Sequence, residues 1–187
     1  MKQVLEFETI DQFGEQQLDQ TLEFSAEEVD RPAEVAQMGP VRIVVAGRAG
    51  AVKGEYELEG KVSFTADLLC SRCLEPYPVA SESPFHIRYA PRSAAPSDEE
   101  LEREITGEEL ELEFFTEPLV SLRELALEQV QLSLPMKPLC GETCAGLCPH
   151  CGANRNRGGC DCGEKAGDDR WSALRGFREQ LVKKNEN

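Results

Sequence analysis

The sequence of 187 residues lacks long apolar runs and an excess of positive charge. Its longest apolar cluster, residues 41–46, contains Arg42, whereas a helix that crosses a bilayer needs about 20 apolar residues. The first residues contain no apolar signal-peptide segment, so we expect a cytoplasmic protein without a membrane partner. The formal net charge of −15 argues against a protein that coats duplex nucleic acid through bulk electrostatics.

Signatures of catalysis are also missing. The two histidines, His86 and His150, have no Ser or Cys partner at a catalytic spacing, and we expect His150 to point outward. The sequence contains no P-loop, no dinucleotide-binding glycine motif and no HExxH motif. We therefore expect a protein that is not an enzyme and for which no small-molecule substrate is evident.

The charge that is present is unevenly distributed. Residues 1–135 carry a net charge of −17 and residues 136–187 a net charge of +2, and residues 98–117 contain ten Asp or Glu with a single Arg. This acidic stretch predicts a solvated segment, with a site for a cation or a basic partner as the alternative.

The first half of the chain predicts β-structure, because apolar and polar residues alternate with a period of two. Pro78 and Pro84 restrict the last of these strands to a sheet edge or interrupt it. The expected strands are residues 3–9, 17–24, 41–46, 56–68 and 77–89. Several short strands at regular spacing indicate an antiparallel sheet or a small barrel.

The second half predicts two helices. Ser121 followed by Glu124 has the pattern of a capping box at the start of a helix over residues 121–134, which Pro135 ends. A closing helix is expected over residues 169–184, where apolar residues form one stripe.

These elements predict an α+β fold in three parts. Residues 1–92 form a β-rich domain, and residues 93–118 form an acidic linker in which residues 109–114 can make an edge strand. Residues 119–187 contain a helix, a cysteine-rich zinc-knuckle region and the C-terminal helix.

Eight cysteines are the strongest chemical signal. Since no export signal is present and the cytosol keeps thiols reduced, metal binding is favoured over disulfides. Cys148 and Cys151 have the C-P-x-C-G form of a zinc-ribbon or rubredoxin knuckle, and Cys160 and Cys162 can complete a closed four-cysteine site. Structural zinc is the favoured occupant, with rubredoxin-like iron or a redox dithiol as alternatives.

The remaining cysteines form two further pairs. Cys70 and Cys73 follow a predicted strand, and Cys140 and Cys144 follow the predicted helix. The two pairs can meet in a second four-cysteine site that clips the β-region to the C-terminal part. Alternatively they stay reduced, or one pair competes for a single zinc ion, so the spacing allows one or two ions.

Local basic residues are the candidates for contact with nucleic acid. Arg155 and Arg157 lie in the knuckle loop, and Arg175 and Arg178 lie on the predicted closing helix. They can contact phosphates or be solvated charges beside a metal loop.

Three motifs follow one another along the chain: L-x-C-S-R-C-L-E-P at residues 68–76, L-P-M-K-P-L-C at residues 134–140, and C-A-G-L-C-P-H-C-G-A-N-R-N at residues 144–156, followed by C-D-C at residues 160–162. Together they resemble the bacterial YceD-like family, which is named for accumulation of the large-ribosomal-subunit RNA. The resemblance covers about residues 20–182 and implies a non-catalytic cytoplasmic factor for normal 23S ribosomal RNA levels, acting in ribosome assembly or RNA processing. The acidic first two-thirds of the chain then favours a basic partner, such as a ribosomal protein or an assembly factor, with local contact to 23S ribosomal RNA as a further possibility.

Overall fold

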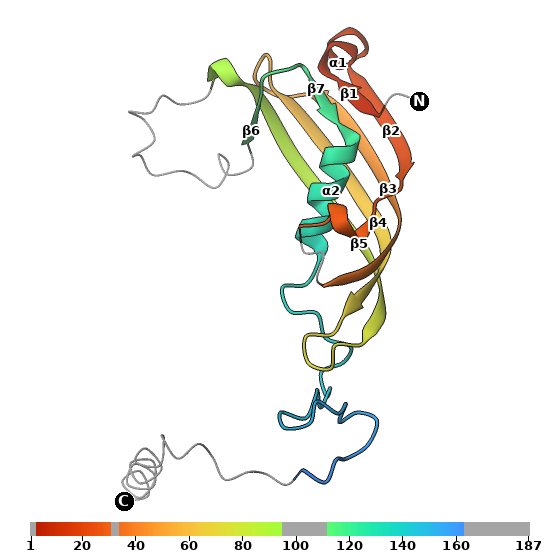
Figure 1. Cartoon of the computed structure of the whole chain (residues 1–187). Coiled ribbons are helices and arrows are strands. Elements are labelled where there is room, and N and C mark those ends of the chain that lie inside the picture. Colours follow the sequence, from red (N-terminus) through yellow and green to blue (C-terminus); the bar gives the residue numbers. More distant parts are fainter. Residues whose placement is uncertain (1–2, 31–33, 95–111, 163–187) are drawn as a thin grey trace, which may run out of the picture.

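The computed structural model describes residues 3–30, 34–94 and 112–162 of the chain (Figure 1). Strands dominate this part of the molecule, and two α-helices accompany them. In chain order the elements are β1 (Val4–Glu6), α1 (Phe7–Phe13), β2 (Glu15–Leu22), the 3-10 turn η1 (Ala26–Glu28), β3 (Val35–Ala49), β4 (Tyr56–Leu69), β5 (Pro76–Pro91), the 3-10 turn η2 (Arg92–Ala94), β6 (Leu112–Phe115), β7 (Leu119–Ser121) and α2 (Leu122–Ser133).

Five of the strands form one open sheet in the order β2-β3-β4-β5-β6. Neighbours from β2 to β5 are antiparallel, whereas β6 runs parallel to the last residues of β5. A separate antiparallel pair joins β1 to β7. The predicted α+β fold with an antiparallel sheet is therefore confirmed, and β2 and β6 are the two edges of the sheet, which does not close into a barrel.

One face of the sheet and one stripe of α2 share a single core. Along β4 buried side chains alternate with half-buried or exposed ones, as expected for a strand whose two faces meet different surroundings. Figure 1 shows α2 lying along this face of the sheet. The helix buries four residues against it, namely Leu122, Leu125, Ala126 and Val130. Each fully buried leucine contributes about 1.5–3 kcal/mol through the hydrophobic effect.

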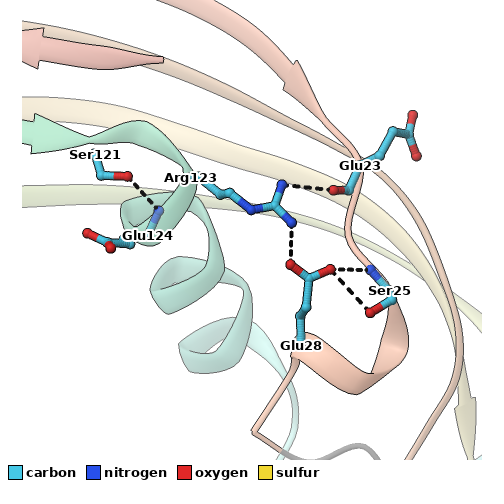
Figure 2. A network of polar contacts seen from close by, with 6 residues as sticks. All are labelled: Glu23, Ser25, Glu28, Ser121, Arg123 and Glu124. Atoms are coloured by element: carbon cyan, nitrogen blue, oxygen red, sulfur yellow. Dashed lines mark hydrogen bonds and ion pairs between the residues drawn. The ribbon is translucent and has the colours of Figure 1, made fainter.

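A polar network fastens the start of α2 to the segment that follows β2 (Figure 2). The guanidinium of Arg123 donates a hydrogen bond to the backbone carbonyl of Glu23 at 3.0 Å and an ion-paired hydrogen bond to Glu28. The same guanidinium lies 4.4 Å from the centre of the Phe24 ring. The carboxylate of Glu28 in turn accepts a hydrogen bond from the backbone N–H of Ser25 at 2.8 Å.

The strand predicted for residues 3–9 is wrong beyond Glu6. The structure ends β1 there and begins α1 at Phe7, because Phe7 and Ile10 are buried at a helical spacing. The ring of Phe7 stacks on Tyr56 with a centroid separation of 4.1 Å. Gly14, with φ of 85°, ends this helix in a conformation that glycine adopts without strain.

The other predicted elements agree with the structure where it describes them. The strand over residues 77–89 corresponds to β5, and β6 contacts only its last four residues, from Arg88 to Pro91. No strand of the described residues pairs with β5 at Pro78 or Pro84 on the side away from β4. Residues 109–111 of the predicted edge strand and the whole predicted helix over residues 169–184 lie outside the described residues.

The long β4–β5 hairpin determines where the cysteines lie. Its tip, residues 70–75, is at the opposite end of the sheet from α1 (Figure 1). After α2, the chain returns to the same end through residues 134–139 and continues as the cysteine-rich segment. The hairpin tip and the cysteine-rich segment therefore lie side by side.

Candidate metal centres

Two groups of four cysteines are assembled at this end of the molecule. The first tetrad consists of Cys70, Cys73, Cys140 and Cys144, and the second consists of Cys148, Cys151, Cys160 and Cys162. Within each tetrad all four Sγ atoms lie within 4.8 Å of one another. The structure thus brings together the two sets that the spacing suggested, while metal binding itself stays a prediction.

The tip of the β4–β5 hairpin holds the first pair of sulfurs. The N–H of Cys70 donates to the carbonyl of Glu75 at 3.0 Å, and the N–H of Leu74 donates to the carbonyl of Cys70 at 2.8 Å. The N–H of Arg72 points at Cys70 Sγ, 3.4 Å away. These three bonds form a tight knuckle in which backbone donors face the sulfur.

The loop that begins at Cys148 repeats the same three bonds. Its N–H donates to the carbonyl of Ala153 at 2.8 Å, and the N–H of Gly152 donates back to Cys148 at 2.9 Å. The N–H of His150 lies 3.5 Å from Cys148 Sγ. Both loops need a left-handed residue directly after their second cysteine, and Gly152 with φ of 73° supplies it in one, whereas Leu74 with φ of 57° supplies it in the other.

The segment after α2 completes the first tetrad by docking on the hairpin tip. Cys144 Sγ lies 3.8 Å from Cys70 Sγ, and Cys140 Sγ lies 3.8 Å from Cys73 Sγ. Arg72 holds this segment in place, because its guanidinium donates to the carbonyls of Glu142 and Cys144 at 2.8 and 3.1 Å.

Backbone contacts extend this docking toward the second tetrad. The N–H of Ser71 donates to the carbonyl of Pro138 at 2.8 Å, and the N–H of Leu147 donates to the carbonyl of Arg72 at 3.0 Å. A Cβ added to Gly146 would lie 3.0 Å from that carbonyl oxygen, so the close approach depends on glycine.

The environment shifts the thiol pKa values in both directions within each tetrad. Burial raises the pKa of Cys70, but backbone donors, above all that of Cys140, outweigh this effect and lower it to about 6. Backbone N–H groups of Cys151 and His150 lower the pKa of Cys148 to about 6 as well. By contrast, hydrogen bonding with Cys144 raises the pKa of Cys140 to about 12.

A soft divalent metal favours four thiolates in a tetrahedral arrangement and displaces the thiol protons when it binds. Four cysteines leave no coordination position open for water or substrate, so the donor set fits a structural metal ion.

A comparison with known protein families identifies the family of this chain. The family model described as "Large ribosomal RNA subunit accumulation protein YceD" matches residues 58–178, which include both tetrads. The chain belongs to this YceD family.

A plant relative carries the same description. The chain is 38% identical over 55 residues to the "Large ribosomal RNA subunit accumulation protein YCED homolog 1, chloroplastic" of Arabidopsis thaliana. The match covers 29% of this chain and 17% of the relative, so the chain spans a small part of that protein. No solved structure matches.

The predicted arginines occupy different settings in this YceD-family protein. Arg155 is exposed, and its backbone N–H donates to the carbonyl of Gly146 at 2.9 Å. Arg157 is exposed but forms an ion pair with Glu75 at 2.6 Å. Arg175 and Arg178 lie outside the described residues.

Sequence reasoning missed the residues that support the sulfurs. Asn156 lies beside the first tetrad although it belongs to the loop of the second, and its Nδ2 donates to Cys144 Sγ at 3.3 Å. Arg72 stands in the sequence only as a spacer in a C-x-x-C pair. A comparison of C-S-R-C-L-E with C-P-H-C-G-A would have indicated two knuckles of one kind, with Leu74 in the position of Gly152.

Two further findings bear on the surroundings of the sites. His150 is exposed, as expected, and belongs to neither tetrad. No helix in the described part of the chain is long and apolar enough to span a membrane.

Proposed function

We propose that this YceD-family protein is a non-catalytic, cytoplasmic factor for the accumulation or processing of 23S ribosomal RNA, acting in biogenesis of the large ribosomal subunit. The observation that carries the proposal is the family match across both cysteine tetrads. The absence of a catalytic motif in the sequence supports a role as an adaptor that holds a partner.

Zinc is the metal that we propose for both tetrads, with all eight cysteines as ligands. In each tetrad the sulfurs are gathered around a knuckle whose backbone N–H groups point at a sulfur. Metal binding free energy then becomes folding free energy for a segment with little apolar core. Residues 70–75 and 140–162 would gain their fixed shape from the two ions.

A basic protein surface is the partner that the charges favour over RNA. The most acidic part of the chain, residues 1–135, carries a net charge of −17. Each zinc ion bound by four thiolates leaves a net charge of −2, which offsets the arginines near the tetrads. Arg72 and Arg157 are also engaged in contacts within the chain. We therefore propose a ribosomal protein or an assembly factor as the direct partner.

Contact with 23S ribosomal RNA is the alternative mode of action. It would use Arg155, Arg157, Arg175 and Arg178, and its affinity would fall as salt rises, because phosphate contacts release counterions. Binding of 23S fragments to the purified protein at several salt concentrations distinguishes the two modes. Salt-dependent binding that weakens in an Arg155→Ala, Arg157→Ala variant would favour RNA over a protein partner.

We also propose a division of labour along the chain. Residues 1–92 act as the scaffold, residues 93–118 as an acidic linker, and residues 119–187 carry the metal-binding part with its helices. The docking of the hairpin tip on residues 140–147 supports a scaffold that positions the metal region.

Depletion of the protein tests the cellular role. The ratio of 23S to 16S ribosomal RNA is expected to fall and to recover when the unmodified chain is supplied. A chain with Cys70→Ser and Cys148→Ser is expected to restore less 23S RNA, whereas a matched Ser93→Ala chain restores it fully. An unchanged ratio after depletion would refute the proposal.

Elemental analysis tests the metal and separates zinc from a redox role. Two zinc ions per chain and no titratable thiols are expected. A red iron centre, or a disulfide that forms and is reduced reversibly, would instead support a rubredoxin-like or thiol-redox protein.

A further inference from the structure

One side chain in the loop of the second tetrad contacts a sulfur of the first. Asn156 lies between Cys151 and Cys160 in the sequence, inside the loop that a metal ion at the second tetrad would close. Its Nδ2 nevertheless donates to Cys144 Sγ at 3.3 Å. Neither the family description nor the cysteine spacing assigns this residue a role.

The orientation of the Asn156 amide is determined by its partners. Its Oδ1 accepts from the backbone N–H of Ala145 at 2.7 Å, and an N–H group can only donate. The Nδ2 must then face the sulfur, and it also donates to Oδ1 of Asn154 at 2.9 Å. The amide is thus held by Ala145 and Asn154 and directs a donor at Cys144 Sγ.

Other contacts hold the same loop against the first tetrad. The N–H of Arg155 donates to the carbonyl of Gly146 at 2.9 Å, and Leu147 pairs with Asn154 in an isolated antiparallel bridge. Arg157 forms its ion pair with Glu75, which belongs to the hairpin knuckle. When residues 148–157 adopt a fixed conformation, these contacts therefore also fix the residues around Cys144.

We propose that Asn156 couples the two metal sites, so that occupation of one tetrad strengthens metal binding at the other. A metal ion at the second tetrad orders the loop and fixes the Asn156 amide against Cys144. An N–H donor stabilises a thiolate ligand, so the first tetrad gains affinity. Because coupling between two binding sites is reciprocal, the first tetrad strengthens the second by the same factor. Asn156 is accordingly a positioning residue, and the inference rests on the proposed metal binding.

The test measures Co²⁺ and Zn²⁺ affinity of the full-length protein in a competition assay with a chromophoric chelator. Asn156→Ala is expected to weaken binding at the first tetrad about tenfold, the lower end of the effect of removing a group that hydrogen bonds to a metal ligand. In a chain whose second tetrad is disabled by Cys151→Ser and Cys162→Ser, the first tetrad is already weakened, and Asn156→Ala is expected to change it less than twofold.

Two further variants separate coupling from simple loss of loop structure. Asn156→Asp keeps an oxygen for the N–H of Ala145 but removes the donor to Cys144, so it is expected to weaken the first tetrad at least as much as Asn156→Ala. The matched control is Arg155→Ala, since Arg155 is the exposed neighbour whose backbone, not its side chain, makes the loop contact. Its metal affinities are expected to stay within twofold of the unmodified chain.

The Co²⁺ spectrum reports on the sulfur itself. Loss of an N–H···S bond raises the energy of the sulfur lone pairs, so the thiolate-to-Co²⁺ charge-transfer band of the first tetrad is expected to move to longer wavelength in both Asn156 variants. An unchanged band together with unchanged affinity would overturn the inference, as would an equal loss in the intact and the disabled chain. Failure of the unmodified chain to bind Co²⁺ or Zn²⁺ would instead refute the proposed metal function.

Discussion

Leu74 is the residue at which the two knuckles differ in conformational energy. It has a φ of 57°, which leucine adopts only at an expense of about 1–2 kcal/mol, and its side chain is 61% exposed. The equivalent Gly152 adopts a φ of 73° without that strain. The backbone of the hairpin knuckle is thus held in place by the bonds around it rather than by its own preference.

We expect Leu74→Gly to stabilise the protein by about 1 kcal/mol, because strain is removed and little apolar burial is lost. For a chain of this size that corresponds to a rise in Tm of about 2–4 °C, measured by thermal denaturation followed by circular dichroism. Gly152→Ala is the matched opposite change and is expected to lower the stability of the second knuckle. A lower Tm for Leu74→Gly would show that the exposed leucine makes a stabilising contact.

Glu128 on α2 gives a pH-dependent prediction. Although the residue is exposed, partial desolvation of its carboxyl raises its pKa above the ordinary value of 4.5, and the charges of Glu113 and Glu124 raise it further. A carboxyl whose pKa is higher in the folded state destabilises the fold when ionised, and this cost disappears as the pH falls through the folded pKa.

Glu128→Gln is therefore expected to raise the free energy of unfolding at pH 7 and to give no gain below about pH 4. Urea denaturation at both pH values measures the difference. Glu117→Gln removes the same charge at an exposed loop position and serves as the control. A gain for Glu128→Gln that persists unchanged in acid would show that charge is not its cause.

For single residues, the sequence predicted the candidate metal-binding cysteines but not the side chains that contact and position them. The eight thiols and their grouping follow from local spacing, since a C-x-x-C pair forms its own turn. Arg72 and Asn156 could not be predicted, because each contacts a segment that reaches it only after the chain has folded back.

Among the elements, α2 has the clearest link between sequence and structure. Ser121 precedes the helix in an extended conformation, and its side chain accepts from the backbone N–H of Glu124 at 3.4 Å. This bond satisfies one of the free N–H groups in the first turn. The neighbouring Arg123 ties the same turn to residues 23–28 (Figure 2).

Ser121→Ala is expected to lower the free energy of unfolding by about 1 kcal/mol, since the capping acceptor is lost. Ser121→Asp keeps an acceptor and places a negative charge at the helix start, so it should stay close to the unmodified protein. Chemical denaturation measures both. Equal losses in the two variants would mean that the serine is needed for its size and not for its cap.

The short elements were harder to predict than the long ones. Residues 3–9 alternate like a strand, but Phe7 is drawn into a helical turn because its ring packs against Tyr56, a residue far along the chain. The long strand β5 was predicted to lie at an edge or to be interrupted at its two prolines, because proline lacks the N–H that an inner strand must donate. It is continuous, and no described strand pairs with its outer side at the prolines. Local pattern decides where a strand of 16 residues forms, whereas distant packing decides a helix of one or two turns.

For the whole molecule, the two tetrads are expected to respond differently to loss of a ligand. Cys148→Ser should open residues 148–162 to cleavage but leave the hairpin tip docked, because the hairpin knuckle keeps its own contacts and the first tetrad, although weakened, still binds zinc. Cys70→Ser should release the entire segment after α2 from the β-sheet, since that segment docks on the hairpin tip. Limited proteolysis of the zinc-loaded proteins measures this, and identical cleavage patterns would contradict two separate centres with different roles in docking.

The meeting of the hairpin tip with residues 140–144 was one of several arrangements that the sequence allowed. Both pairs of cysteines are local features, yet their encounter depends on the length of β4 and β5 and on the course of the chain after α2. The uneven distribution of charge along the chain follows from the sequence alone. It identifies the acidic part of the chain but does not predict the ion pair between Arg157 and Glu75.

The sulfur contacts of the first tetrad join residues that are 74 and 67 positions apart in the chain. A metal ion that stays bound to these cysteines in the denatured protein acts as a covalent cross-link does, because it closes a loop of that length and restricts how far the chain can expand. Closure of such a loop removes conformational freedom worth about 4 kcal/mol in the chain-entropy model. A chelator that removes the ion from the hairpin tip would therefore lower the free energy of unfolding of the whole sheet, including its far end where Phe7 stacks on Tyr56, because it acts on the unfolded chain to which every native contact is compared.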